Sequence, residues 1–146
     1  MSIAALTPFQ TTIIPEGQDM TPAIKKALEE LQAHFPSLIS WKEVSNGSFE
    51  VAVERLDLGQ PYKQQDTWFG FTITPLVEYA DVYPHFVRPD LSRTDGAQLG
   101  QAFQQNRSFY DRPAVQVSRR AKMSGPEYPV SPLLKLLKVH QWMLSQ

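Results

Sequence analysis

Two dipeptides, Thr21-Pro22 and Ser131-Pro132, constrain the fold of this chain more than any other feature of the sequence. A threonine or serine side chain can accept a hydrogen bond from a free backbone N–H in the first turn of a helix. A proline at the first helical position lacks an N–H group that would have no intrahelical partner anyway. Each dipeptide therefore predicts the start of a helix, one near each end of the chain.

Side chains spaced three and four residues apart follow both predicted helix starts, as in a helix that packs one face on a core. In the first helix these are Ile24, Ala27, Leu28, Leu31 and Phe35. In the second they are Leu133, Leu136, Leu137, His140 and Leu144. Pro36 predicts the end of the first helix, because its ring disfavours helical geometry at the residue before it.

Between the two helices the sequence alternates apolar and polar residues, which is typical of strands. Residues 41–58 predict a hairpin with a turn at Asn46-Gly47, and residues 68–74, 82–87 and 114–118 predict further short strands. The intervening segment 91–112 shows no apolar periodicity. We expect it to form a long irregular crossing with one helical turn at residues 97–104.

The chain of 146 residues has the usual length of one domain. We expect a loose N-terminal arm over residues 1–18 and a single domain over 19–146. The fold class is α+β, with an N-terminal helix, an antiparallel meander of about four strands, the long irregular crossing and a C-terminal helix. The helices are expected to cover one face of the sheet.

The complete absence of cysteine excludes a disulfide framework, zinc thiolate sites, iron–sulfur clusters and a thiol nucleophile in this chain. The three histidines, His34, His85 and His140, are far apart and show no metal-ligand spacing. We expect no metal. The chain also lacks the motifs GxSxG, GxxxxGK[ST] and GxGxxG, so we expect no serine-hydrolase chemistry, no nucleotide site and no cofactor.

No targeting signal is evident in residues 1–15, and no apolar run approaches the length of about 20 residues that a membrane-spanning helix needs. A cytoplasmic location without membrane association is the simplest expectation. Charge is uneven: residues 1–90 hold 12 acidic and 6 basic side chains, whereas residues 91–146 hold 3 and 8. Either the two halves pack in complementary fashion, or the C-terminal half faces an acidic partner.

A basic cluster, Arg119, Arg120 and Lys122, lies in that C-terminal half. Such a cluster can bind phosphate groups or an acidic protein surface. A nucleic-acid-binding domain usually carries a clear positive net charge, whereas the formal net charge here is −1. We therefore favour a protein partner over a nucleic acid.

The stretch WFGFTITPLVEYADVYPHFVRP resembles the segment of ubiquitin-conjugating enzymes in which a strand runs into a Tyr-Pro turn and the next strand. The matching residues are Gly70, Phe71, Ile73, Tyr83, Pro84 and Pro89. The order of a capped helix, a hairpin and this segment also resembles the RWD-like relatives of that fold. The resemblance implies a ubiquitin-conjugating-like fold. It is also compatible with a role in a bacterial ubiquitin-like pathway.

In that family the acceptor cysteine would fall near Gln116, and the preceding His-Pro-Asn segment has no counterpart here. An amide cannot hold a thioester, so the resemblance implies a catalytically silent, protein-binding member. Its partner would be a ubiquitin-like modifier or the activating or conjugating enzyme of that modifier. The expected partner-binding residues are Tyr83, Pro84, Pro89, Arg119, Arg120 and Lys122.

Three alternatives remain open from the sequence. One is a small hydrolase or ligand-binding protein with a carboxylate–arginine site under residues 91–112, formed by Asp95 or Asp111 with Arg107 or Arg112. Another is a structural subunit of a larger assembly. The last is an active conjugating enzyme whose native cysteine has been replaced. The sequence predicts no oligomeric state.

Overall fold

The computed structural model describes residues 20–45, 47–120 and 131–146, which form two helices and six strands. In chain order they are α1 (Pro22–His34), β1 (Ile39–Ser45), β2 (Ser48–Asp57), β3 (Asp66–Ile73), β4 (His85–Val87), β5 (Phe103–Phe109), β6 (Arg112–Val117) and α2 (Pro132–Leu144). The expected arm at residues 1–18 lies outside the described residues.

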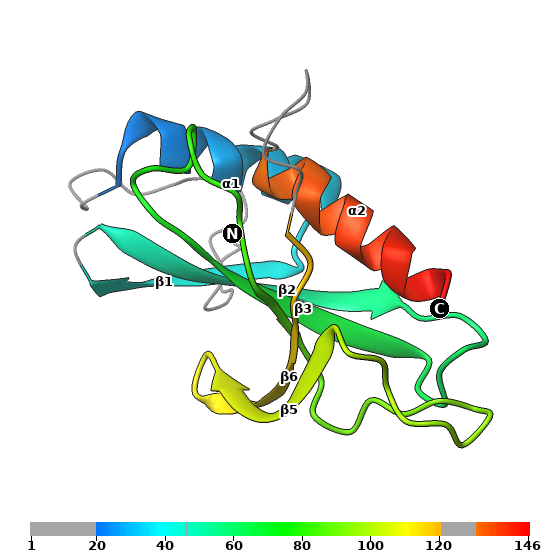
Figure 1. Cartoon of the computed structure of the whole chain (residues 1–146). Coiled ribbons are helices and arrows are strands. Elements are labelled where there is room, and N and C mark those ends of the chain that lie inside the picture. The colour runs from blue at the N-terminus through cyan, green and yellow to red at the C-terminus, as the bar shows by residue number, and fades with distance from the viewer. Residues whose placement is uncertain (1–19, 46, 121–130) are drawn as a thin grey trace.

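All six strands form one antiparallel sheet in the order β1-β2-β3-β4-β6-β5. Both helices lie on the same face of this sheet (Figure 1). The fold is therefore α+β, as the sequence predicts. Among the described residues, no helix is long and apolar enough to cross a membrane.

Both predicted helix starts are confirmed. The Thr21 hydroxyl accepts a hydrogen bond of 3.2 Å from the backbone N–H of Ile24, and the Ser131 hydroxyl accepts one of 3.2 Å from Leu134. The first helix ends at His34, two residues before Pro36. Local capping chemistry alone therefore locates α1 and the start of α2.

The predicted hairpin and the strand after it are confirmed as β1, β2 and β3, and their alternation decides what is buried. Phe49, Val51 and Val53 of β2 are fully buried in the core between the sheet and the helices. The same core takes Phe69 and Phe71 from β3. The antiparallel sheet thus packs one face against α1 and α2.

The expected irregular crossing over residues 91–112 is wrong in its second half. Residues 97–104 form no helical turn, and Phe103–Phe109 form strand β5, paired antiparallel with β6. Apolar periodicity is absent because β5 is an edge strand, and its residues 105–108 are exposed and polar. Its pairing with β6 is a tertiary contact that composition cannot reveal.

The expected meander of about four strands also needs correction. After β4 the chain passes to the edge of the sheet as β5 and returns as β6, which inserts between β4 and β5. The strand predicted at residues 82–87 is shorter, because only His85–Val87 pair with β6. The strand next to β4 in the sheet is therefore β6, which comes late in the chain.

The hairpin of β5 and β6 brings Phe109 over Gly70 of β3, on the sheet face opposite the helices. Phe109 is 6% exposed and stacks on Phe86 of β4 with ring centroids 4.7 Å apart. A Cβ atom built on Gly70 would overlap the Phe109 ring. A glycine at this point of β3 thus lets the hairpin pack closely on the sheet.

We predict that Gly70→Ala lowers the free energy of unfolding by about 1–3 kcal/mol, because the added methyl group forces Phe109 out of its place. Urea denaturation of the full chain measures this change. Gly100→Ala is the matched control, since no atom lies within 4 Å of a Cβ built there. Equal stabilities of the two variants would contradict the packing argument.

Candidate functional site

Two arginines at the end of β6 stack on two aromatic rings from distant parts of the chain. The Arg120 guanidinium carbon lies 3.9 Å from the centre of the Tyr83 ring, and that of Arg119 lies 4.5 Å from the centre of the Trp142 ring. We call these four residues the arginine–aromatic surface. It combines the end of β6, the segment before β4 and the last turns of α2.

The register of β4 and β6 explains half of this arrangement. His85 of β4 pairs with Val117 of β6 in an antiparallel register. The residues just before His85 and just after Val117 therefore leave the sheet at the same end. This pairing places Tyr83 and Arg120 together although they are 37 positions apart in the sequence.

Both arginines are exposed, and neither has a carboxylate partner within the described part of the chain. Stacking on a ring occupies the face of a guanidinium group and leaves the N–H groups at its edge available. Such cation–π contacts contribute about 0.5–1 kcal/mol at exposed sites. The surface is thus a pair of oriented hydrogen-bond donors without a carboxylate from residues 20–45, 47–120 or 131–146.

A buried ion pair lies close to the arginines. The Lys135 Nζ and Asp81 Oδ1 atoms are 2.6 Å apart, and the two side chains are only 4% and 7% exposed. Burial lowers the pKa of Lys135, and the positive charges of Arg119 and Arg120 lower it further, while Asp81 opposes both effects. This ion pair joins α2 to the segment just before Tyr83.

His85 is fully buried against the rings of Phe69 and Phe71, with centroids 6.4 and 5.3 Å away. Neither ring nitrogen has a hydrogen-bond partner among the described residues. Burial, together with the charge of Lys135, lowers the pKa of His85 to about 3. The imidazole is therefore neutral at pH 7.

The structure brings together most of the residues predicted to bind a partner. Tyr83, Arg119 and Arg120 belong to one surface, and Pro84 follows Tyr83 through a cis peptide bond. Pro89 does not join them, because it follows the opposite end of β4 and is exposed there. Lys122 lies outside the described residues.

Gln116, the position nearest the family nucleophile, lies in the middle of β6. Its register partners are Phe86 of β4 and Gln104 of β5. The Gln116 side-chain amide donates a hydrogen bond of 3.0 Å to the Ser118 hydroxyl, which donates one of 2.5 Å to the Gln104 side-chain oxygen. These hydrogen bonds join β6 to β5, and Gln116 is not a thiol nucleophile.

The four residues proposed for a carboxylate–arginine site do not pair with one another. Each makes its contact elsewhere: Asp95 with Arg93, Asp111 with Lys42, Arg112 with Glu54, and Arg107 with the backbone carbonyl of Gln105. The arrangement expected under residues 91–112 is therefore replaced by three separate ion pairs and one hydrogen bond to a backbone carbonyl. Within the described residues, no group of three or more His, Asp or Glu side chains could hold a metal ion.

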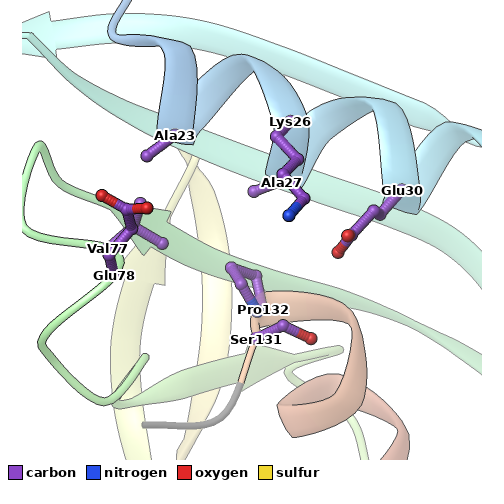
Figure 2. A pocket seen from close by; sticks show the side chains of 8 residues that line it. All are labelled: Ala23, Lys26, Ala27, Glu30, Val77, Glu78, Ser131 and Pro132. Atoms are coloured by element: carbon purple, nitrogen blue, oxygen red, sulfur yellow. The ribbon is translucent and has the colours of Figure 1, made fainter.

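A cavity of about 260 Å³ lies between α1, the segment after β3 and the start of α2 (Figure 2). Its lining residues are Ala23, Lys26, Ala27, Glu30, Val77, Glu78, Ser131 and Pro132. None of them belongs to residues 91–112. The cavity is partly open to solvent and combines small apolar side chains with three charged ones.

Lys135, Asp81, His85 and Trp142 were not singled out by the sequence as a site. One signal was present for Lys135: it lies three residues after Pro132 and four before Val139, both of which are buried on the same helix face. A lysine on a buried helical stripe indicates a buried acidic partner. The partner itself is set by long-range packing.

No family model matches this chain, and neither a curated protein nor a solved structure matches it. The described geometry therefore carries the functional interpretation.

The neutral state of His85 makes stability depend on pH. The pKa of about 3 in the folded chain is below the ordinary value of 6.5, so the unfolded chain binds a proton first as the pH falls. The contribution of His85 to the free energy of unfolding is complete above pH 6.5. It is lost as the pH falls from 6.5 to about 3. We predict a loss of about 2 kcal/mol near pH 5, and a flatter profile for His85→Leu, measured by urea denaturation. Parallel profiles would contradict the burial of a neutral imidazole.

The Lys135–Asp81 pair yields a second prediction. Lys135→Met removes one partner and leaves a buried carboxylate, which we expect to lower the free energy of unfolding by about 3–5 kcal/mol. The double variant Lys135→Met/Asp81→Asn should recover part of this loss, because no net charge is then buried. Thermal or urea denaturation measures both, with exposed Lys63→Met as the control. A loss no greater than that of the control would show that the pair is not buried in solution.

Proposed function

We propose that this chain is a catalytically silent protein-binding module with a ubiquitin-conjugating-like fold. It engages a ubiquitin-like modifier or an active enzyme that handles such a modifier. The observation that carries the proposal is the arginine–aromatic surface, in which Arg119 and Arg120 stack on Trp142 and Tyr83 without a carboxylate partner among the described residues.

The composition of this surface supports a protein partner. Arginine, tyrosine and tryptophan are the residues most enriched among those that dominate the energy of protein interfaces. Arginines already ordered by stacking lose less conformational freedom when a partner binds. The formal net charge of −1 also means that the exposed positive charge here is local and not a property of the whole chain.

The chemistry of the chain supports a silent role. With no cysteine there is no thiolate to form a thioester, and the amide of Gln116 is occupied by Ser118. A module without the nucleophile can still position a modifier or an active enzyme. These observations support binding, rather than group transfer, as the role of the chain.

The arrangement of elements supports the family assignment within this proposal. An N-terminal helix packs on an antiparallel sheet, and the Tyr83-Pro84 turn leads into β4. The residues that carry the resemblance occupy structural positions: Phe71 and Ile73 are core residues, and Gly70 accommodates Phe109.

Affinity capture from the lysate of the source organism, followed by mass spectrometry, tests the proposal. We expect the wild-type chain to retain a ubiquitin-like protein or one of its activating or conjugating enzymes, and Arg119→Glu/Arg120→Glu to lose it. Lys63→Glu/Arg107→Glu is the matched control, because it makes the same change of charge at exposed positions elsewhere.

Retention of the same protein by both double variants would remove the arginine–aromatic surface from the proposal. Capture of proteins unrelated to any modifier pathway would overturn the assignment to such a pathway. Direct mixing of the purified chain with the captured protein, monitored by size-exclusion chromatography, separates direct from indirect contacts.

A further inference from the structure

We propose that the arginine–aromatic surface binds an extended acidic segment of a partner protein, with one carboxylate at Arg119 and another at Arg120. This inference deepens the proposed function and rests on it for the choice of surface. It adds the chemistry of the partner, which the proposed function leaves open.

Arg112 in the same chain provides an internal precedent. Its guanidinium carbon lies 3.8 Å from the centre of the Trp68 ring, and its Nη2 atom lies 3.0 Å from the Glu54 carboxylate. One arginine thus stacks on a ring by its face and holds a carboxylate by its edge. Planar guanidinium groups are suited to this combination, because the donors lie in the plane of the group.

Arg119 and Arg120 repeat the stacking on a ring, but among the described residues no carboxylate binds them. Each is stacked on a ring, at 4.5 Å from Trp142 and 3.9 Å from Tyr83 respectively. Neither has a carboxylate among residues 20–45, 47–120 and 131–146. Both are exposed, so a carboxylate from another molecule can reach them.

The acidic residue Asp81 forms a buried ion pair close to this surface. Asp81 holds the ammonium group of Lys135 at 2.6 Å, and both side chains are buried. The charges of Lys135 and Asp81 therefore oppose each other within this pair. Burial lowers the pKa of Lys135, and repulsion by Arg119 and Arg120 lowers it further. A partner that supplies two negative charges would relieve this repulsion.

The two rings that hold the arginines come from different elements. Trp142 comes from α2, whereas Tyr83 precedes β4. Each guanidinium group therefore stacks on a ring from a different element. We infer one carboxylate for each arginine, and the comparison with a single anion is part of the test.

The test is a titration of the ¹⁵N-labelled full chain with synthetic peptides, followed by the indole and arginine side-chain resonances. The probe is a glycine–serine peptide with two glutamates, made with short and long spacers between them. The same peptides with glutamine, a peptide with one glutamate, and inorganic phosphate are the controls. We expect the best two-glutamate peptide to bind about tenfold more tightly than its glutamine version, and more weakly as salt is added.

Variants locate the site. Arg119→Gln and Arg120→Gln should each weaken binding about fivefold or more, consistent with the loss of one charged hydrogen-bond pair. Arg119→Lys keeps the charge but loses the planar donor edge, so an intermediate affinity is expected. Lys63→Gln/Arg107→Gln is the control for net charge and should bind as the wild type does.

Equal binding of the glutamate and glutamine peptides, or no binding by either, would overturn the inference. So would phosphate or the one-glutamate peptide binding as tightly as the best two-glutamate peptide, since this would indicate a single-anion site. If the acidic peptides bind but no modifier-pathway protein is captured, the proposed function fails and the acidic-segment site remains. If capture depends on both arginines but acidic peptides do not bind, the inference fails and the proposed function remains.

Discussion

The buried pair of Lys135 and Asp81 is the contact on which the described surface depends. Removing two charges from water costs several kcal/mol per ion, and only a close contact between the two can offset this. The observed distance of 2.6 Å meets that requirement. Lys135 belongs to α2 and Asp81 precedes β4, so the pair joins the helix that carries Trp142 to the segment that carries Tyr83.

Burial of the pair also separates two kinds of charge in one small region. Asp81 binds Lys135 in the interior, whereas Arg119 and Arg120 remain at the surface without a carboxylate among the described residues. Aromatic rings support these arginines from beneath, as Trp68 supports Arg112 on the other face of the sheet. The difference is that Arg112 has its own carboxylate from Glu54. The chain thus uses ring-stacked arginines in two ways. Arg112 holds the β5–β6 hairpin to the rest of the sheet, whereas Arg119 and Arg120 present hydrogen-bond donors to solvent.

Local signals predicted the elements whose causes are local. The hydroxyl caps at Thr21 and Ser131 need partners only three residues away, and alternation in β2 and β3 needs only two faces of different polarity. β5 was missed for the opposite reason. Its exposed side chains carry no periodicity, and the strand exists because β6 supplies hydrogen-bond partners along one edge. The late insertion of β6 into the sheet was missed with it.

The sequence by itself determined the two helices, the first three strands and the absence of thiol chemistry, because these depend on neighbouring residues or on composition. It also pointed to Tyr83, Pro84, Arg119 and Arg120. Only the tertiary structure decided that Tyr83 lies beneath Arg120 while Pro89 lies apart, since the β4–β6 register sets which strand ends meet. It likewise decided the pairing of Lys135 with Asp81, because a buried charge finds its partner across the fold and not along the chain.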